Sequence, residues 1–294
     1  MAAAAVVAVA AVVAEVGAVA EPLGIGLGWR PELSAVLAED PSLFVEVIAE
    51  NVDPSRLPDD LAALVAEGRT VIPHGIRLSL GGARHPDPRR LDHLATLAER
   101  VRAPFVSEHI AFARAHGVEA GHVLPVPRSR EALDIIAENV AVAQAALPVP
   151  LALEHVAALV EWPDPTMSET EFIAALLERT GALLLLDVSN LYANAYNHGF
   201  DVVGALGELP LDRIAYVHVG GGTHRDGRYY DTHTDPVAPE VLAVAEELCA
   251  RADPPGLLLE RDGGFPSADG TRAELDAIAA AARAGASRRA GRAV

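Results

Sequence analysis

The chain has 294 residues, 51% of them hydrophobic, and this length suits one (β/α)8 barrel, which typically needs roughly 250 residues. Its formal net charge of -18 argues against a nucleic-acid partner, because duplex binding requires clustered basic residues that release counterions. A single cysteine, Cys249, excludes an internal disulfide and favours a reducing, cytoplasmic compartment.

The first 20 residues are rich in Ala and Val and could be mistaken for an export signal. They carry Glu15 inside the apolar run and have no basic segment before it. A secretory signal has a positively charged start, and a bilayer span needs about 20 predominantly apolar residues. We therefore expect residues 1–20 to be an extension outside the fold, without a membrane partner.

Eight short apolar runs follow one another along the chain. They are Gly24–Gly28, Phe44–Ile48, Val71–His74, Phe105–Ser107, Leu151–Leu153, Leu183–Leu186, Ile214–Val219 and Leu257–Leu259. Segments with a 3.6-residue hydrophobic period lie between them, including Arg90–Val101, Arg130–Ala146, Glu169–Arg179 and Glu240–Ala250. Alternating strands and helices are typical of parallel sheets with crossover helices. Eight repeats predict an α/β fold, a TIM barrel of one domain over residues 21–285, followed by a flexible tail at 286–294.

An open, doubly wound sheet is the alternative architecture. It requires a Gly-rich phosphate-binding turn after the first strand, with an acidic residue at a set distance beyond it. The stretch GIGLGWRPEL matches this pattern only in a degenerate form and lacks the acidic residue. The closed barrel is therefore the favoured interpretation.

Carboxylates and imidazoles stand at or just beyond the end of nearly every predicted strand. In chain order they are Glu46, Glu50, His74, Glu108, His109, Glu154, His155, Asp187, His218, Glu260 and Asp262. One such residue taken alone is usually a loop residue bonded to the backbone, so the prediction rests on the repetition. The carboxyl ends of barrel strands meet at one face, and burying these groups together is costly unless cations compensate them. The pattern therefore predicts metal binding.

Nine residues are the candidate ligands: His74, His109, Glu154, Asp187, His198, His218, Asp231, His233 and Glu260. The set contains no thiolate, which excludes thiolate-bound zinc and iron–sulfur clusters and suits zinc, manganese or non-haem iron. Nine ligands are too many for one ion, so the sequence predicts two or three.

The same segments carry a resemblance to a known family. PHGIRLSLGG, VSEHIAF, LALEHVAAL, LLLLDVSNLYANAYNHGFD, DTHTDPV and LLLERDGGFP resemble successive motifs of the multinuclear non-haem iron-dependent oxidative enzymes (MNIO), long described as DUF692. The resemblance runs from about Gly24 to Pro266. It implies a TIM barrel with two or three iron ions (Fe²⁺/Fe³⁺), and dioxygen as co-substrate. It also implies oxidative modification of a residue, often cysteine, in a ribosomally synthesised precursor peptide.

The resemblance also assigns roles residue by residue. His74, His109 and Glu154 would hold one iron, with Glu154 bridging to a second held by Asp187, His218 and Glu260. His198, Asp231 and His233 would hold the third. The implied catalytic residues are Glu154, Asp187 and His218. Groups implied to orient ligands or contact substrate are Glu50, Asn51, Glu108, His155, Asn190, Asn194 and His224.

The chain departs from the family pattern at two positions. His155 stands where the family commonly has Asn, and Gly222 stands where it commonly has a second His, with His224 as the nearby candidate substitute. The relative that acts in methanobactin biosynthesis works with a small protein that presents the peptide, so the resemblance implies such a partner. Zinc or manganese are the expected substitutes for iron.

Arginines in or beside the predicted strand-end loops favour a peptide substrate. The loops are Gly81–Arg89, His116–Arg128 and Gly220–Pro236, and the arginines are Arg84, Arg89, Arg90, Arg114, Arg128, Arg225 and Arg228. A basic rim on an acidic protein would attract an acidic leader peptide. The alternative is that these arginines pair with loop carboxylates.

Three other functions remain open at this stage. A divalent-metal sugar isomerase or epimerase also places Glu, Asp and His at barrel strand ends, but needs no dioxygen and no peptide. A metal-binding protein without turnover is the non-enzymatic alternative. A trinuclear nuclease is the fourth, and the charge of -18 argues against it.

Overall fold

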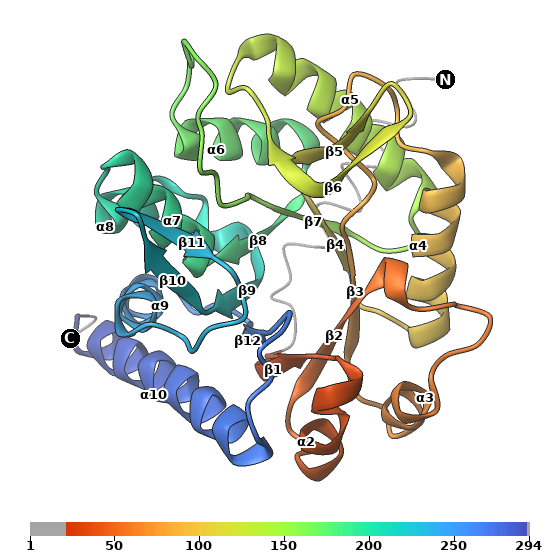
Figure 1. Cartoon of the computed structure of the whole chain (residues 1–294), viewed down its shortest axis with the longest axis vertical. Coiled ribbons are helices and arrows are strands. Elements are labelled where there is room, and N and C mark those ends of the chain that lie inside the picture. Colours follow the sequence, from red (N-terminus) through yellow and green to blue (C-terminus); the bar gives the residue numbers. More distant parts are fainter. Residues whose placement is uncertain (1–21, 293–294) are drawn as a thin grey trace.

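The computed structural model describes residues 22–292, so the expected extension at residues 1–20 lies outside the described part (Figure 1). Eight parallel strands close into a barrel in the order β1-β12-β9-β8-β7-β4-β3-β2. Their bounds are β1 Gly24–Gly28, β2 Phe44–Ile48, β3 Val71–Gly75, β4 Val106–His109, β7 Leu151–Glu154, β8 Leu183–Asp187, β9 Ile214–Gly220 and β12 Gly256–Glu260. The predicted TIM barrel is confirmed, and each predicted strand agrees with an observed one to within two residues at either end.

Helices follow most strands and cover the outside of the barrel. They are α2 Ser34–Glu39, α3 Asp59–Ala66, α4 Pro88–Val101, α5 Arg130–Ala146, α6 Glu169–Thr180, α7 Val188–His198, α8 Val202–Glu208, α9 Pro239–Arg251 and α10 Ala268–Arg292. Short 3-10 turns lie at η1 Pro31–Leu33, η2 Ala49–Asn51 and η3 Leu211–Arg213. Local signals set several starts: Ser168 and Glu171 form a reciprocal capping box at α6, and the Asp187 carboxylate accepts from two backbone N–H groups at the start of α7.

Strand register brings the polar strand ends to the same level. His109 on β4 pairs in register with Glu154 on β7, and Asp187 on β8 with His218 on β9. Because side chains of paired residues point to the same face of a sheet, these four groups enter the barrel together. Register therefore decides which of the predicted ligands can meet.

An apolar layer lies beneath the polar strand ends inside the barrel. It consists of Phe44, Ile72, Phe105, Ala152, Leu185, Ala215, Tyr216 and Leu258. Gly26 leaves room for this layer, since a Cβ there would lie 2.5 Å from the Phe44 ring. The larger core fills the space between the strands and the surrounding helices. Cys249 on α9 is buried there.

Two of the expected loops are partly β-hairpins, which corrects the prediction. β5 Ala111–Ala115 pairs with β6 Val118–Pro125, and β10 Gly222–Arg225 pairs with β11 Arg228–Asp231. The turns are His116-Gly117 and Asp226-Gly227, and all four residues have φ between 51° and 81°. Positive φ at both turn positions is the conformation that two-residue hairpin turns require, so the Asp226-Gly227 pair was a readable signal.

Residues 286–292 of the expected tail are helical, because α10 continues to Arg292. Gly285 allows α10 to approach α9 closely, since a Cβ there would lie 2.3 Å from the Glu246 carbonyl oxygen. Arg288 then pairs with Glu246 and Glu247 on α9. Close helix packing and ion pairs thus hold a segment that looks polar and small in sequence. No helix within residues 22–292 combines the length and apolar character needed to cross a bilayer.

Candidate metal centre

The barrel interior changes from apolar to polar toward the carboxyl ends of its strands. Within one strand an apolar residue is followed two positions later by a polar one, as in Ile72 and His74 or Leu185 and Asp187. Side chains two positions apart in a strand point to the same face, so both layers face the interior. The two-residue period of the strands therefore places a ring of carboxylates and imidazoles above the apolar layer.

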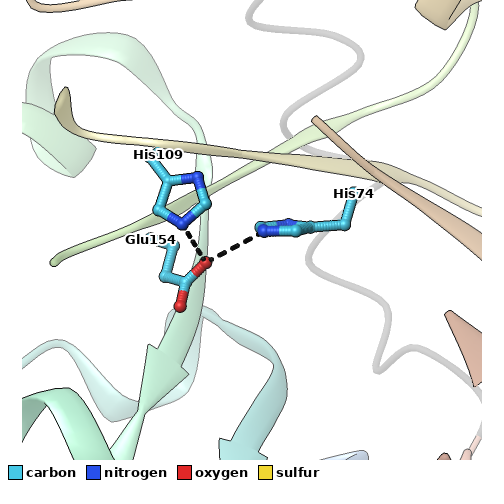
Figure 2. Close-up of side chains that lie close together, drawn as sticks. All are labelled: His74, His109 and Glu154. Carbon is cyan, nitrogen blue, oxygen red and sulfur yellow. Dashed lines mark ion pairs between the residues drawn. The ribbon is translucent and has the colours of Figure 1, made fainter. Parts of the chain in front are cut away.

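The first ligand group consists of His74, His109 and Glu154. Both imidazole rings point at one carboxylate oxygen, with Glu154 Oε2 lying 3.4 Å from His74 Nε2 and 3.2 Å from His109 Nε2 (Figure 2). One ligand atom from each residue lies within 4.8 Å of the others. This is the first predicted group, brought together in full.

A second group shares Glu154 with the first. Its members are Glu154, Asp187, His218 and Glu260, all buried. His218 Nδ1 lies 2.8 Å from Glu260 Oε2 and 3.4 Å from the other Glu154 oxygen, Oε1. The two oxygens of Glu154 therefore face different ligand groups.

A third group shares Asp187 with the second and contains Asp231 and His233. His233 Nε2 lies 2.8 Å from Asp231 Oδ2 and 3.7 Å from Asp187 Oδ2. His233 adopts a left-handed φ of 52°, and Gly220 makes room for its ring, since a Cβ there would lie 2.4 Å from Cδ2. The left-handed backbone of His233 and the absence of a side chain at Gly220 thus both allow this imidazole to reach its position.

A fourth combination joins His233 and Glu260 to Asp262. Asp262 was not among the predicted ligands, although it stands two residues beyond Glu260 in the sequence. It also pairs with Arg30, whose Nη2 lies 2.5 Å from Asp262 Oδ1. Asp262 is thus held at the edge of the ligand groups by a cation from the segment after β1.

The donor set fits metal ions. Three buried carboxylate oxygens of these groups have no hydrogen-bond partner among the described residues: Glu154 Oε2, Asp187 Oδ2 and Asp231 Oδ1. Buried polar atoms are otherwise almost always paired, and unpaired carboxylates together are costly. The set offers only imidazole and carboxylate donors, which suit iron, zinc and manganese.

Without metal, several of these groups hold protons. Burial opposes protonation of His109, but the Glu154 and Glu108 carboxylates outweigh it and raise its pKa to about 9. Burial, followed by the Asp231 charge, raises the pKa of Asp187 to about 8. Metal ions must displace these protons, so binding is expected to strengthen as pH rises.

His198 does not lie with the other predicted ligands, which contradicts its assignment to the third ion. Its Nε2 lies 2.7 Å from the Ala158 carbonyl oxygen and its Nδ1 lies 3.6 Å from Glu161. Asp187 caps the start of α7 and His198 ends it, and 11 residues of helix span about 16 Å. Helix geometry thus carries His198 away from the barrel centre, and Asp187 takes its place in the third group.

The residues predicted to support the ligands divide into three kinds. Asn190 donates to Glu154 Oε1 at 3.3 Å and to the His155 carbonyl, so it does contact a ligand. Glu50 and Glu108 accept backbone N–H groups from Ile76 and Leu78, and so hold the segment after β3. Asn51 is exposed on η2.

His155, Asn194 and His198 line a separate small cavity of about 50 Å³ together with Glu169. His155 is buried and neither ring nitrogen has a hydrogen-bond partner among the described residues. Burial lowers the pKa of His155 to about 4, so this ring is neutral. His155 and Asn194 therefore lie behind the ligands, and the first departure from the family pattern does not alter the ligand set.

The second departure, at Gly222, is explained by Tyr229. A Cβ at Gly222 would lie 2.6 Å from Tyr229 Cζ, so the tyrosine ring fills the space that a side chain would need. His224 is exposed and its ring packs on Tyr196, which contradicts its role as a substitute ligand. Tyr229 was missed, although it precedes Asp231 by two residues on one strand and so shares its face.

A cavity of about 490 Å³ opens above the ligand groups. Its floor includes His74, His109, Glu154, His233 and Glu260, and its walls come from both hairpins, with Glu119 and His122 on β6 and Tyr229 and Tyr230 on β11. The two hairpins thus enclose the approach to the candidate metal centre from different parts of the chain.

Asn197 on α7 anchors the β10–β11 hairpin. Its side chain accepts from Tyr229 N at 2.9 Å and donates to the Tyr229 carbonyl at 2.8 Å, and α7 packs against β11 (Figure 1). Asn197→Ala should lower the free energy of unfolding by about 1–3 kcal/mol, because both Tyr229 groups lose their partner. The same change should weaken the third group through Asp231.

Thermal unfolding and metal content of the purified variant test this expectation. Asn197→Asp is the matched control, since it keeps the acceptor for Tyr229 N and should give an intermediate result. Wild-type stability and third-site occupancy in Asn197→Ala would show that the hairpin is held by other contacts.

Comparison with known proteins identifies the family. Residues 24–283 match the sequence profile of a family described as RiPP precursor modification enzyme MbnB/TglH/ChrH. The chain belongs to this family. A UPF0276 protein of Streptomyces avermitilis is 52% identical over 264 residues, covering 87% of this chain and 54% of the relative. This chain thus spans about half the length of that relative, and membership confirms the resemblance seen in the sequence.

Solved structures of low identity share the barrel. Endonuclease IV from Thermus thermophilus superposes with a TM-score of 0.58 at 18% identity, covering 88% of this chain and 99% of that one. An L-ribulose 3-epimerase superposes with a TM-score of 0.54 at 20% identity, covering 92% and 96%. Similarity at this level shows the fold alone, so the family assignment, and not these neighbours, bears on function.

Proposed function

We propose that this chain is a multinuclear non-haem iron enzyme that uses dioxygen to modify a residue, most simply a cysteine, of a ribosomally synthesised precursor peptide. The observation that carries the proposal is the set of three connected ligand groups at the floor of a cavity open to solvent. Membership in a family of precursor-modifying enzymes supports the peptide substrate.

The ligand groups define which residues would hold each ion. His74, His109 and Glu154 would hold the first, and Glu154, Asp187, His218 and Glu260 the second. Asp187, Asp231 and His233 would hold the third. Iron bound by imidazole and carboxylate supplies redox chemistry and open positions for dioxygen and a sulfur ligand.

The chain's own residues would exclude water and orient the peptide. The β5–β6 and β10–β11 hairpins wall the cavity, and the arginines near its rim mostly brace these walls. Arg90 pairs with Glu119 at 2.6 Å, and Arg225 lies over the Tyr230 ring with its Cζ 4.5 Å from the centroid. Arg89 and Arg128 also pair with carboxylates. These contacts support the alternative that several rim arginines are structural, so electrostatic attraction of a leader would be weaker than the sequence indicates.

Metal and oxygen measurements together test the proposal. Protein purified without oxygen should contain about two to three iron ions per chain, since the fourth ligand combination takes Glu260 from the second group and His233 from the third and so leaves three groups to hold ions. With a precursor peptide encoded beside the gene, and a small presenting partner if one is encoded there, it should consume dioxygen and change the peptide mass. Zinc or manganese should occupy the same ligands but support no oxygen uptake.

A different outcome would identify another function. Active protein containing one zinc and no iron would overturn the iron assignment. Turnover of a sugar under anaerobic conditions, with no effect of the peptide, would instead support an isomerase or epimerase.

A further inference from the structure

A continuous chain of buried hydrogen bonds runs beneath the ligand groups and connects two of them. Ser107 Oγ lies 2.8 Å from His74 Nδ1 and 2.7 Å from Tyr216 Oη. Tyr216 Oη donates to Glu46 Oε2 at 2.5 Å, and the same oxygen lies 2.6 Å from His218 Nε2. Each of these five residues is at most 1% exposed. Closure of the barrel brings these five residues together from four strands, β2, β3, β4 and β9.

Counting the available protons shows that every hydrogen bond in this series is donated toward Glu46. Glu46, as a carboxylate, only accepts, so Tyr216 donates its one proton to Glu46 and His218 donates from Nε2. Tyr216 Oη can then only accept from Ser107, and Ser107 Oγ, having used its proton, accepts from His74 Nδ1.

The second nitrogen of each ring faces a ligand group and would bind an ion there. With Nδ1 of His74 donating to Ser107, its Nε2 lone pair faces Glu154 Oε2 at 3.4 Å. With Nε2 of His218 donating to Glu46, its Nδ1 faces Glu260 Oε2 at 2.8 Å. His74 thus presents Nε2 to its ligand group, whereas His218 presents Nδ1 to its own. The same series of hydrogen bonds accounts for both tautomers.

We propose that Ser107, Tyr216 and Glu46 are positioning residues that fix the tautomer and ring orientation of His74 and His218 together, and so prepare the first and second ion sites as one unit. The inference rests on the proposed metal centre but needs neither iron, dioxygen nor peptide. Tyr216 is the link among the described residues, because its hydroxyl bonds both to Ser107 and to Glu46. Packing holds its ring in place, with the Phe44 and Phe105 centroids 6.2 and 5.5 Å away.

Three substitutions distinguish the part of the hydrogen-bond series at Ser107 from the part at Glu46. Tyr216→Phe keeps the ring and removes the link, so the Ser107 half loses its fixed direction, whereas His218 keeps Glu46 as its acceptor. Ser107→Ala frees only His74, and Glu46→Gln replaces only the carboxylate that accepts from His218 and Tyr216. Tyr196→Phe, at a ring that is 47% exposed, is the matched loss of a hydroxyl outside the chain.

The test uses zinc, which is diamagnetic, bound to the full chain labelled with ¹⁵N-histidine. In the wild type, NMR should show exchange-protected N–H protons on Nδ1 of His74 and on Nε2 of His218. Tyr216→Phe should remove the protection of His74 Nδ1 and weaken zinc binding at the first site by about 10- to 100-fold, measured by chelator competition, while the His218 signal persists because Glu46 still accepts from it. Ser107→Ala should affect the His74 signal and the first site, whereas Tyr196→Phe should match the wild type.

Two results would overturn the inference. One is that Tyr216→Phe keeps the His74 N–H signal and wild-type zinc affinity at the first site, even if its melting temperature falls. The other is that Ser107→Ala weakens both sites equally, which would indicate a general packing defect; this variant also serves if Tyr216→Phe does not fold. A wild-type chain that binds no zinc overturns the metal centre itself. Normal zinc results without peptide oxidation would instead overturn only the proposed function.

Discussion

Replacing Glu154 with alanine should remove about two ions per chain, whereas replacing Asp231 with alanine should remove about one, because Glu154 belongs to two ligand groups and Asp231 to one. The Glu154 oxygens face different partners, with Oε2 near His74 and His109 and Oε1 near His218. Losing both oxygens leaves the first group with two imidazoles and the second without its bridge. Metal analysis of protein saturated with iron or zinc and then desalted gives the count.

Asp187→Ala supplies the internal control for this count. Asp187 joins the second and third groups, so its loss should spare the first ion that Glu154→Ala removes. Substitution of Cys249, which lies on α9 away from the groups, should leave the count unchanged. An equal loss of a single ion in the Glu154 and Asp231 variants would show that Glu154 does not bridge.

The metal-free protein should become less stable as pH rises from 6.5 to 9, and bound metal should reverse this trend. Asp187 and His109 have pKa values raised from 3.8 to about 8 and from 6.5 to about 9, so the folded state binds more protons than the unfolded state across this range. The free energy of unfolding then decreases with pH. Glu154, whose pKa the histidines lower to about 2 against the effect of burial, contributes only at lower pH.

The expected loss is on the order of 3 kcal/mol, or roughly 5–10 °C in melting temperature. Thermal unfolding of chelator-treated protein at several pH values measures it, and saturation with zinc should raise stability most at high pH, where no proton competes for the ligands. Asp187→Asn should flatten the metal-free dependence. A metal-free wild type that is more stable at pH 9 than at pH 6.5 would contradict the assignment of these protons.

Much of the barrel could be predicted because its signals are local. Runs such as Leu183–Asp187 are apolar up to the final carboxylate, as buried parallel strands are, and the helical segments between them carry a clear 3.6-residue period. A polar residue at a strand end also needs no tertiary information to be recognised. His74, His109, Glu154, Asp187, His218 and Glu260 were accessible in this way.

Groups outside the strand ends were harder to place. Asp231 and His233 follow a hairpin, and only the pairing of β10 with β11 and the left-handed backbone of His233 bring them to Asp187. His198 lies nearer to Asp187 in sequence than these two residues do, yet the length of α7 carries it away. Sequence distance does not determine spatial distance once a helix intervenes.

The sequence by itself determined the barrel, the strand-end ligands and the absence of thiolates among them, because strand and helix periods and residue chemistry are properties of short segments. Only the tertiary structure decided which candidate ligands lie together and what holds them in place. Glu46 and Tyr216 lie 170 residues apart, and closure of the barrel is what brings the Tyr216 hydroxyl to the Glu46 carboxylate. Such contacts depend on register between distant strands, which no local pattern specifies.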